Sequence, residues 1–315
     1  MFRTPQPQAA ISISGDGIAA VGFGGLTGQL SLSVQEVIAF ESGSIAPTLM
    51  CSNIIDPGSV TTALQEVLAR YRKRPKRIAM VLPDAIAKVT LLGFDTLPDR
   101  DSDLAQLIRL KLQKSAPFSL DEAQLSYIDC GKSPTKQSQF LTVVVHKSVL
   151  GEYEKICNDA GLQVGRIDLA SFNLINTALF TNRKQRMGDW MLVHAARHYS
   201  TVTIVRGSQL VFYRTLTAEP SHSLEDFIYQ STMYYEDRLA GTGIEQIIFV
   251  TSAIESDSEP LEPMFERVFE RSGNVVFEQL GKRISVAIDN ADSVPIAMLD
   301  SLAAPIGILV RDRHN

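Results

Sequence analysis

The stretch 190–215, WMLVHAARHYSTVTIVRGSQLVFYRT, decides the fold. It predicts three short strands, 191–195, 200–206 and 209–215, because its apolar residues are mostly β-branched and a glycine occupies the second turn. The first turn, 195–199, bears on function. A turn that cradles a nucleotide phosphate needs small residues whose amides reach the ligand and a carboxylate that holds Mg²⁺. This turn contains alanine, arginine and histidine but no acid.

Composition limits the class of protein. With 315 residues the chain exceeds the usual length of one domain, so two lobes or a large insertion are expected. The net charge of −5 argues against nucleic-acid binding as the main activity. Three scattered cysteines predict neither a disulfide framework nor a zinc motif. No apolar run reaches the roughly 18 to 20 residues that span a bilayer, so we expect a cytoplasmic protein that meets a membrane only through partners.

The order of elements in the second half repeats that in the first. The first half is expected to contain three strands, a helix and a fourth strand, at 9–14, 18–23, 30–40, 57–71 and 77–82. In the second half, a helix that Ser223 caps and a strand at 246–251 follow the strands of 190–215. Duplicated lobes of this order with a cleft between them are the plan of the actin-like (ribonuclease-H-like) ATPase fold, an α/β fold.

A block of different pattern interrupts the first half. Residues 84–162 predict an inserted α+β subdomain with strands and helices of its own. The first lobe is then 1–83 together with 163–185, and Ser171 is expected to cap its last helix. The second lobe is 186–315, and its final helix is expected to return to the first lobe.

Short motifs spread over nearly the whole chain carry a family resemblance. They are Val81-Leu82-Pro83; Phe94 with Leu97-Pro98; Lys114-Ser115-Ala116-Pro117-Phe118 with Asp121 and Tyr127; Ala160-Gly161-Leu162 with Ile167-Asp168; Val205-Arg206-Gly207; Leu210-Val211-Phe212 with Arg214; and Ser231 with Tyr234 and Tyr235. In their order and spacing the chain resembles the type IV pilus assembly protein PilM family. These are actin-like proteins of the cytoplasmic face of the pilus platform, related to the cell-division protein FtsA.

The sequence departs from the family pattern at all three loops that would bind a nucleotide. By resemblance these loops fall on Ser12, Ser14, Gly15 and Asp16, on His194, Ala195 and Ala196, and on Thr251 and Ser252. Without a carboxylate near the phosphates, Mg²⁺ has no protein ligand and an attacking water has no orienting acid. Without glycines, side chains crowd the backbone amides away from the phosphates. The departures predict a pseudo-ATPase without catalytic residues, metal or cofactor.

The sequence leaves two interpretations open for each of three sets of residues. Asp16 either replaces the missing acid or is an ordinary turn aspartate between two glycines. His194 and His198, with His222, either bind a metal or an anion or have no ligand role. The basic run 72–77 either meets anionic lipid headgroups or is the solvated end of a helix whose dipole it complements.

The resemblance implies a scaffold rather than an enzyme. Such a protein binds the N-terminal cytoplasmic segment of a PilN-type inner-membrane protein and connects the platform to the pilus motor ATPases; self-association stays open. The resemblance places the peptide groove between the inserted subdomain and the first lobe, at Lys114, Pro117, Phe118, Asp121, Val143 and Val145. The competing hypotheses are an assembly switch that binds ATP and Mg²⁺, and a cytoplasmic platform component of a type II secretion system.

Overall fold

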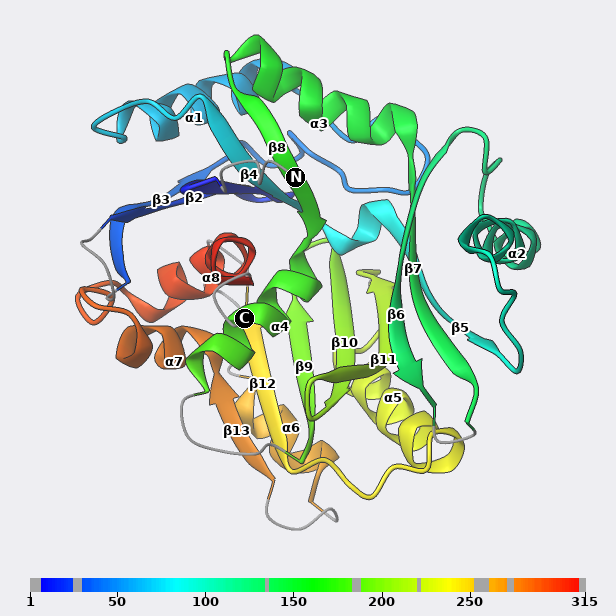
Figure 1. Ribbon diagram of the computed structural model, residues 1–315. Coiled ribbons are helices and arrows are strands. Elements are labelled where there is room, and N and C mark those ends of the chain that lie inside the picture. The colour runs from blue at the N-terminus through cyan, green and yellow to red at the C-terminus, as the bar shows by residue number, and fades with distance from the viewer. Residues whose placement is uncertain are drawn as a thin grey trace.

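Two five-stranded sheets with the same strand order and one three-stranded sheet form the molecule (Figure 1). The computed structural model describes residues 7–24, 30–133, 136–182, 188–219, 222–251, 261–270 and 275–311. Within these ranges no helix has both the length and the apolar character needed to cross a membrane.

The first sheet has the strand order β3-β2-β1-β4-β8. Its strands are β1 (Ala9–Ile13), β2 (Gly17–Gly24), β3 (Ser31–Ala39), β4 (Arg77–Leu82) and β8 (Gln163–Leu169). β1, β2 and β3 form antiparallel hairpins, whereas β4 pairs in parallel with β1 and β8. A parallel pair needs a crossover connection, and α1 (Pro57–Ala69) lies in the one that precedes β4. α1 and α3 (Lys147–Asp159) cover one face of this sheet (Figure 1).

The second sheet repeats this arrangement as β11-β10-β9-β12-β13. Its strands are β9 (Asp189–Ala195), β10 (Tyr199–Arg206), β11 (Gln209–Thr217), β12 (Gln246–Thr251) and β13 (Val276–Gln279). α5 (Leu224–Arg238) and α6 (Glu262–Val268) cover its outer face. The predicted duplicated actin-like fold is therefore confirmed, because the two sheets share one strand order although their sequences show no evident repeat.

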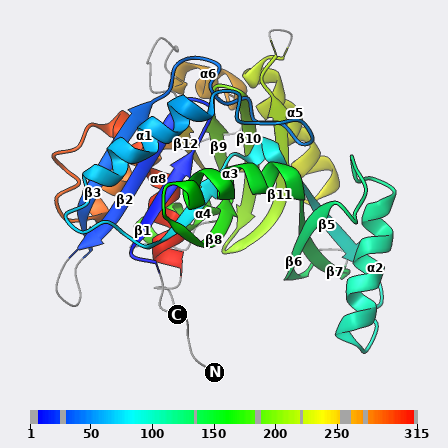
Figure 2. The same cartoon turned by 90° about the horizontal axis from the view of Figure 1, so that it is seen from above.

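The third sheet belongs to the inserted segment. It has the order β5-β7-β6, with strands β5 (Ala87–Phe94), β6 (Ala123–Lys132) and β7 (Ser138–His146). α2 (Asp101–Gln113) packs on one of its faces. Figure 2 shows this sheet and α2 projecting to one side of the two-lobed body.

One central layer of helices joins the two large sheets. α4 (Ala170–Thr181), α7 (Leu280–Ala287) and α8 (Ile296–Val310) contribute to a core that both sheets share. α8 contacts β1, β2 and β4 of the first sheet and β12 of the second. It also lies so close to α4 that a Cβ atom at Gly307 would fall 1.8 Å from the carbonyl oxygen of Asn173.

Two local features differ from the sequence prediction. Ser171 is not the cap of α4: that helix begins at Ala170, and Leu169 occupies the cap position without a side-chain bond. The hydroxyl of Ser171 instead donates to Asp84, in a short 3₁₀ helix, η1 (Asp84–Ile86), that follows β4. α7 was not predicted, because its eight residues follow β13 directly without a side-chain cap.

Candidate functional site

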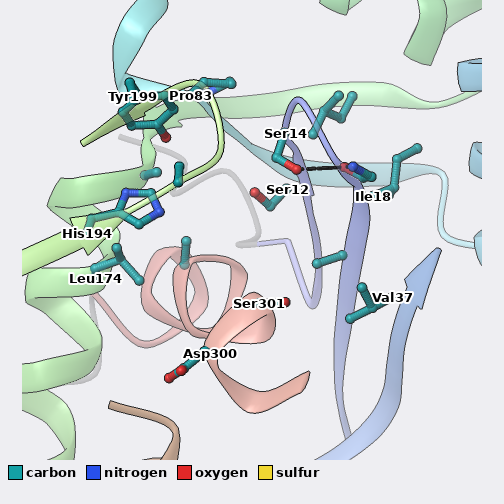
Figure 3. Close-up of a pocket in the computed structure, with 16 residues that line it drawn as sticks. Ser12, Ser14, Ile18, Val37, Pro83, Leu174, His194, Tyr199, Asp300 and Ser301 are labelled. Atoms are coloured by element: carbon teal, nitrogen blue, oxygen red, sulfur yellow. Dashed lines mark hydrogen bonds between the residues drawn. The ribbon is translucent and has the colours of Figure 1, made fainter. Parts of the chain in front are cut away.

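The turn between β1 and β2 folds onto its own serine. Ser14 Oγ accepts hydrogen bonds from the backbone amides of Asp16 and Gly17, each at 3.2 Å. The same hydroxyl donates to the carbonyl oxygen of Gly17, also at 3.2 Å (Figure 3). In a phosphate-binding turn such amides point at the ligand. Here the amides of Asp16 and Gly17 already donate hydrogen bonds to the Ser14 side chain.

The turn between β9 and β10 carries a buried histidine. The ring of His194 lies edge to face against the ring of Tyr199, with 5.4 Å between their centroids. Its Nδ1 atom is 3.6 Å from a carboxylate oxygen of Asp84. The amide of Ala196 donates to the carbonyl oxygen of Tyr199 at 3.0 Å and closes the turn. An imidazole thus occupies the position at which the family pattern has an acid.

The two turns contact each other across the space between the lobes. The guanidinium of Arg197 lies 3.5 Å from a carboxylate oxygen of the buried Asp16. The ring of His198 covers Gly15, where a Cβ atom would fall 2.1 Å from its Cδ2 atom. A side chain at position 15 would therefore displace the His198 ring from its present place.

Four of the candidate nucleotide residues line one small cavity between the lobes (Figure 3). Ser12 and Ser14 line it from β1 and its turn, and His194 and Ala196 line it from β9 and its turn. The cavity volume is about 40 Å³. Sites for small molecules measure roughly 300 to 1,000 Å³. In the described ranges no group of three or more His, Cys, Asp and Glu side chains is placed to hold a metal ion.

Asp84, which sequence reasoning missed, connects the parts of the molecule at this point. Its carboxylate is fully buried and accepts hydrogen bonds from the amide of Ser171 at 3.0 Å and from Thr201 Oγ1 at 3.0 Å. Ser171 belongs to α4 and Thr201 to β10, so one acid binds the first lobe to the second. Burial, and then the charge of Asp84, raise the pKa of Tyr199 and of Tyr213 well above the ordinary value. The signal available in the sequence was a charged residue directly after a buried strand.

A second buried acid lies on α8, at the far wall of the same cavity (Figure 3). Asp300 accepts hydrogen bonds from Gln279 Nε2 at 2.6 Å and from the amide of Gly281 at 2.7 Å. Burial raises the pKa of Asp300 to about 7, although these hydrogen bonds act to lower it. Thr251, from the third of the predicted nucleotide loops, is 3.5 Å from the same carboxylate. Ser252, from that loop, lies outside the described residues.

The structure does not bring the predicted groove residues together. Lys114, Pro117, Phe118 and Asp121 lie beside α2, where Phe118 and Asp121 line a surface cavity of about 410 Å³. Val143 and Val145 face the other way: Val145 is in the core of the first lobe, and Val143 packs against that core. Successive residues of a strand point to opposite faces of its sheet. The intervening Val144 faces α2.

Val143 lines a larger groove on the opposite side of the inserted sheet. This groove has a volume of about 730 Å³ and lies between β6 and β7, the start of α4 and the β10–β11 turn. Its apolar lining consists of Tyr127, Ile128, Leu141, Val143, Phe172, Ile175 and Leu210. Polar groups at its rim include Asp168 and Arg311, which form an ion pair at 3.3 Å. Of the residues predicted for the groove, Val143 is the one that lines it.

Comparison with solved structures identifies the fold. The structure of a PilM-PilN type IV pilus biogenesis complex is similar to this chain with a TM-score of 0.77 and 12% identity, covering 98% of this chain and 99% of that one. The cytoplasmic domain of EpsL, an inner membrane component of the type II secretion system of Vibrio cholerae, is similar with a TM-score of 0.50 and 10% identity, covering 84% and 94%. At these identities the likeness shows the fold alone.

Comparison with sequences identifies the family. A search of curated proteins gave no match. The family model described as type IV pilus assembly protein PilM matches residues 10–237, which is more than half of the chain. That range includes both candidate turns, Asp84 and the whole inserted sheet. It also includes β9, β10, β11 and nearly all of α5 in the second lobe. This chain therefore belongs to the PilM family of type IV pilus assembly proteins.

Proposed function

We propose that this chain is a non-catalytic scaffold of the type IV pilus platform that binds the N-terminal cytoplasmic segment of a PilN-type inner-membrane protein. Family membership supports the pilus assembly role. The similar structure, solved as a PilM-PilN complex, supports the choice of partner. Such a scaffold would lie on the cytoplasmic side of the inner membrane. Contacts with motor ATPases and self-association stay predictions.

The observation that carries the proposal is the open groove beside β6. β6 is an edge strand of the inserted sheet in the described part of the chain, so its outer main-chain groups are placed to pair with an added strand. The side chain of Ile128 on this strand is 54% exposed, and Tyr127 beside it is 37% exposed. A peptide that adds to β6 would cover Ile128 on the groove face, whereas the ring of Tyr127 contacts Phe140 on the opposite face. Main-chain hydrogen bonds would supply affinity, and the apolar side chains specificity.

A binding measurement with single variants tests the groove. We expect Ile128→Ser to weaken binding of the synthetic N-terminal segment at least tenfold, because burial of one such side chain contributes roughly 1.5 to 3 kcal/mol. Fluorescence anisotropy of the labelled peptide measures the affinity. Val286→Ser is the matched control, since Val286 is an 86% exposed aliphatic residue on α7 and lies outside the groove.

A third variant separates the two cavities of the inserted subdomain. Phe118 lines the cavity beside α2 and its ring contacts that of His146, with 4.9 Å between centroids. If Phe118→Ala weakens the peptide and Ile128→Ser leaves its affinity unchanged, the peptide binds on the α2 side. The proposed groove would then be wrong.

We infer that the chain does not use ATP, because three features of the cleft oppose it. The amides of the first turn donate to Ser14. The acid nearest the turns, Asp16, is paired with Arg197. The remaining cavity of about 40 Å³ is far smaller than a nucleotide site. A nucleotide could bind only if the two turns moved apart and these contacts broke. The free energy lost with the contacts would oppose its binding.

Titration calorimetry and thermal unfolding with ATP and Mg²⁺ test this inference. A ligand present at 100 times its dissociation constant stabilises the native state by about 2.7 kcal/mol, which a melting scan detects easily. We expect neither heat nor a melting shift at millimolar ATP. A clear shift would overturn the pseudo-ATPase proposal, and Asp16→Ala would then show whether that acid holds the metal.

A further inference from the structure

The turn between α1 and β4 concentrates positive charge in a protein that is negative as a whole. Six of its eight residues are cations: Arg70, Arg72, Lys73, Arg74, Lys76 and Arg77. The whole chain has a net charge of −5. In Figure 1 the turn lies at the end of α1 that points away from α2. We name the segment 70–77 the basic turn.

Three of these cations have structural contacts. Arg70 lies 3.8 Å from a carboxylate oxygen of Glu36, and the guanidinium of Arg74 donates to the carbonyl oxygen of Ala160, the last residue of the α3 cap. The guanidinium of Arg77 lies against Gly165 of β8. These contacts fix the path of the turn over the edge of the first sheet.

The other three cations, Arg72, Lys73 and Lys76, have exposed side chains. Among the residues that the structure describes, none of these three side chains forms a hydrogen bond or an ion pair. Two acids on the adjoining elements have cations of their own: Glu36 lies near Arg70, and Asp159 pairs with Lys155 at 2.7 Å. The three charges are therefore available to an external anion.

The helix dipole does not account for this cluster. α1 ends at Ala69 with Arg70 as its cap, and its last turn contains no basic residue. The dipole acts within the last turn of a helix. Arg72, Lys73 and Lys76 lie beyond it, in the segment that leads to β4. The dipole of α1 therefore gives no reason for these three cations to cluster here.

Further cations connect the basic turn with the groove beside β6. Arg166 follows Gly165 on β8, the edge strand of the first sheet. Burial raises the pKa of Asp168, and the charges of Arg311 and Arg166 oppose that rise, so both cations lie close to this carboxyl group. Asp168 and Arg311 also line the groove. Arg166 therefore lies between the basic turn and the Asp168–Arg311 ion pair at the rim of the groove.

We propose that the basic turn docks this protein on an anionic phospholipid surface. Arg72, Lys73 and Lys76 would meet the headgroup phosphates, since clustered lysines and arginines bind anionic bilayers by electrostatic attraction. The interaction needs no peptide in the groove. Together with a peptide contact it would give two weak attachments on one protein, which bind far more tightly than either alone.

A membrane is favoured over a nucleic acid for two reasons. The negative charge of the whole chain would repel a flexible polyanion that wraps around it, whereas a planar surface meets the basic turn alone. The second reason rests on the proposed function, because a partner anchored in the inner membrane brings this surface close to the headgroups.

Vesicle co-flotation of the full chain tests the proposal. The probe is phosphatidylcholine vesicles with and without phosphatidylglycerol, at about 0.05 M and about 0.5 M salt. We expect binding to the anionic vesicles at the lower salt concentration, and its loss with neutral vesicles or at the higher salt concentration. Replacing Arg72, Lys73 and Lys76 by glutamine should lower the partition coefficient about a hundredfold. The three side chains form no hydrogen bond or ion pair within the described part of the chain, so the variant should fold.

A matched control removes the same charge elsewhere. Lys88, Arg238 and Lys282 are three exposed cations on other elements, and their replacement by glutamine should change partitioning by less than about threefold, since only long-range charge is altered. The proposal is overturned if the wild-type chain ignores anionic vesicles, or if both triple variants lose binding equally. It is also overturned if the chain binds duplex DNA as tightly as it binds vesicles.

Peptide binding in the same variants separates this proposal from the proposed function. The glutamine variant of the basic turn should bind the partner peptide in solution with unchanged affinity. Ile128→Ser should bind vesicles as the wild-type chain does. If the peptide fails to bind but the vesicle result holds, the membrane surface stands and the scaffold proposal fails.

Discussion

The cleft between the lobes and the groove beside β6 are both junctions between parts of the fold, yet one is closed and the other is open. The cavity in the cleft has a volume of about 40 Å³, and the groove has a volume of about 730 Å³. Polar side chains close the cleft: Ser14 accepts amides of its own turn, and Asp84 binds groups from both lobes. The groove has an apolar wall with exposed residues. This difference is the reason for proposing that the partner peptide binds at the inserted sheet.

The largest effect is expected from the wall that closes the cleft. Gly307→Ala would place a Cβ atom 1.8 Å from the carbonyl oxygen of Asn173, so α4 and α8 must separate. We expect the free energy of unfolding to fall by at least about 3 kcal/mol, since backbone cannot move aside as a side chain can. Urea denaturation measures this loss. Gly151→Ala on α3, where no atom lies within 4 Å of the new Cβ, should be neutral or slightly stabilising.

Removal of the buried acid should be the next largest effect. Asp84→Ala leaves Ser171 and Thr201 without their acceptor in a buried place, and we expect a loss of about 3 kcal/mol of unfolding free energy. A double-mutant cycle with Thr201→Val isolates the contact between the lobes. A coupling energy near zero would mean that Asp84 does not hold the lobes together.

The third prediction concerns pH and the far wall of the cleft. The pKa of Asp300 is raised by burial to about 7 in the native state, whereas an unfolded aspartate titrates near 3.9. A raised native pKa favours the protonated form, so its stabilising contribution is complete below about pH 4 and is lost as pH rises toward 7. Relative to Asp300→Asn, the wild-type protein should lose about 2 kcal/mol of unfolding free energy between pH 5 and pH 7.

Urea denaturation of both proteins across that range gives the difference. Comparison with the asparagine variant removes the contributions of all other titrating groups. A difference that does not change with pH would show that Asp300 is ionised throughout, and that the cleft wall tolerates a buried charge.

The smallest effect on stability is expected at the ion pair between the turns. Arg197 is 52% exposed and lies 3.5 Å from Asp16, so Arg197→Ala should change the unfolding free energy by less than about 1 kcal/mol. This variant nevertheless tests the comparison most directly. We expect thermal unfolding to show no effect of ATP and Mg²⁺ on it, because Ser14 still accepts the turn amides and His198 still covers Gly15. A melting shift with ATP would show that one ion pair keeps the cleft closed.

Local pattern was sufficient for most elements of the fold, although not for α7 or the cap of α4. Strand alternation and helix periodicity depend on neighbouring residues, so the hairpins of both lobes and α1 were predictable from sequence, and the order in which they recur indicated the duplication. The residues at the two turns were identified by the family resemblance, and Ser12, Ser14, His194 and Ala196 do line one cavity.

Tertiary structure alone decided what those residues do. Asp84 meets Thr201 across 117 positions of the chain, and no local pattern reports a contact of that range. The residues predicted to form one groove lie on two opposite faces of the inserted sheet. Phe118 lies on the side of α2, whereas strand alternation directs Val143 to the other side. Sequence determined the elements and their order, because these follow from short-range propensity. The closure of one junction and the opening of the other follow from long-range packing.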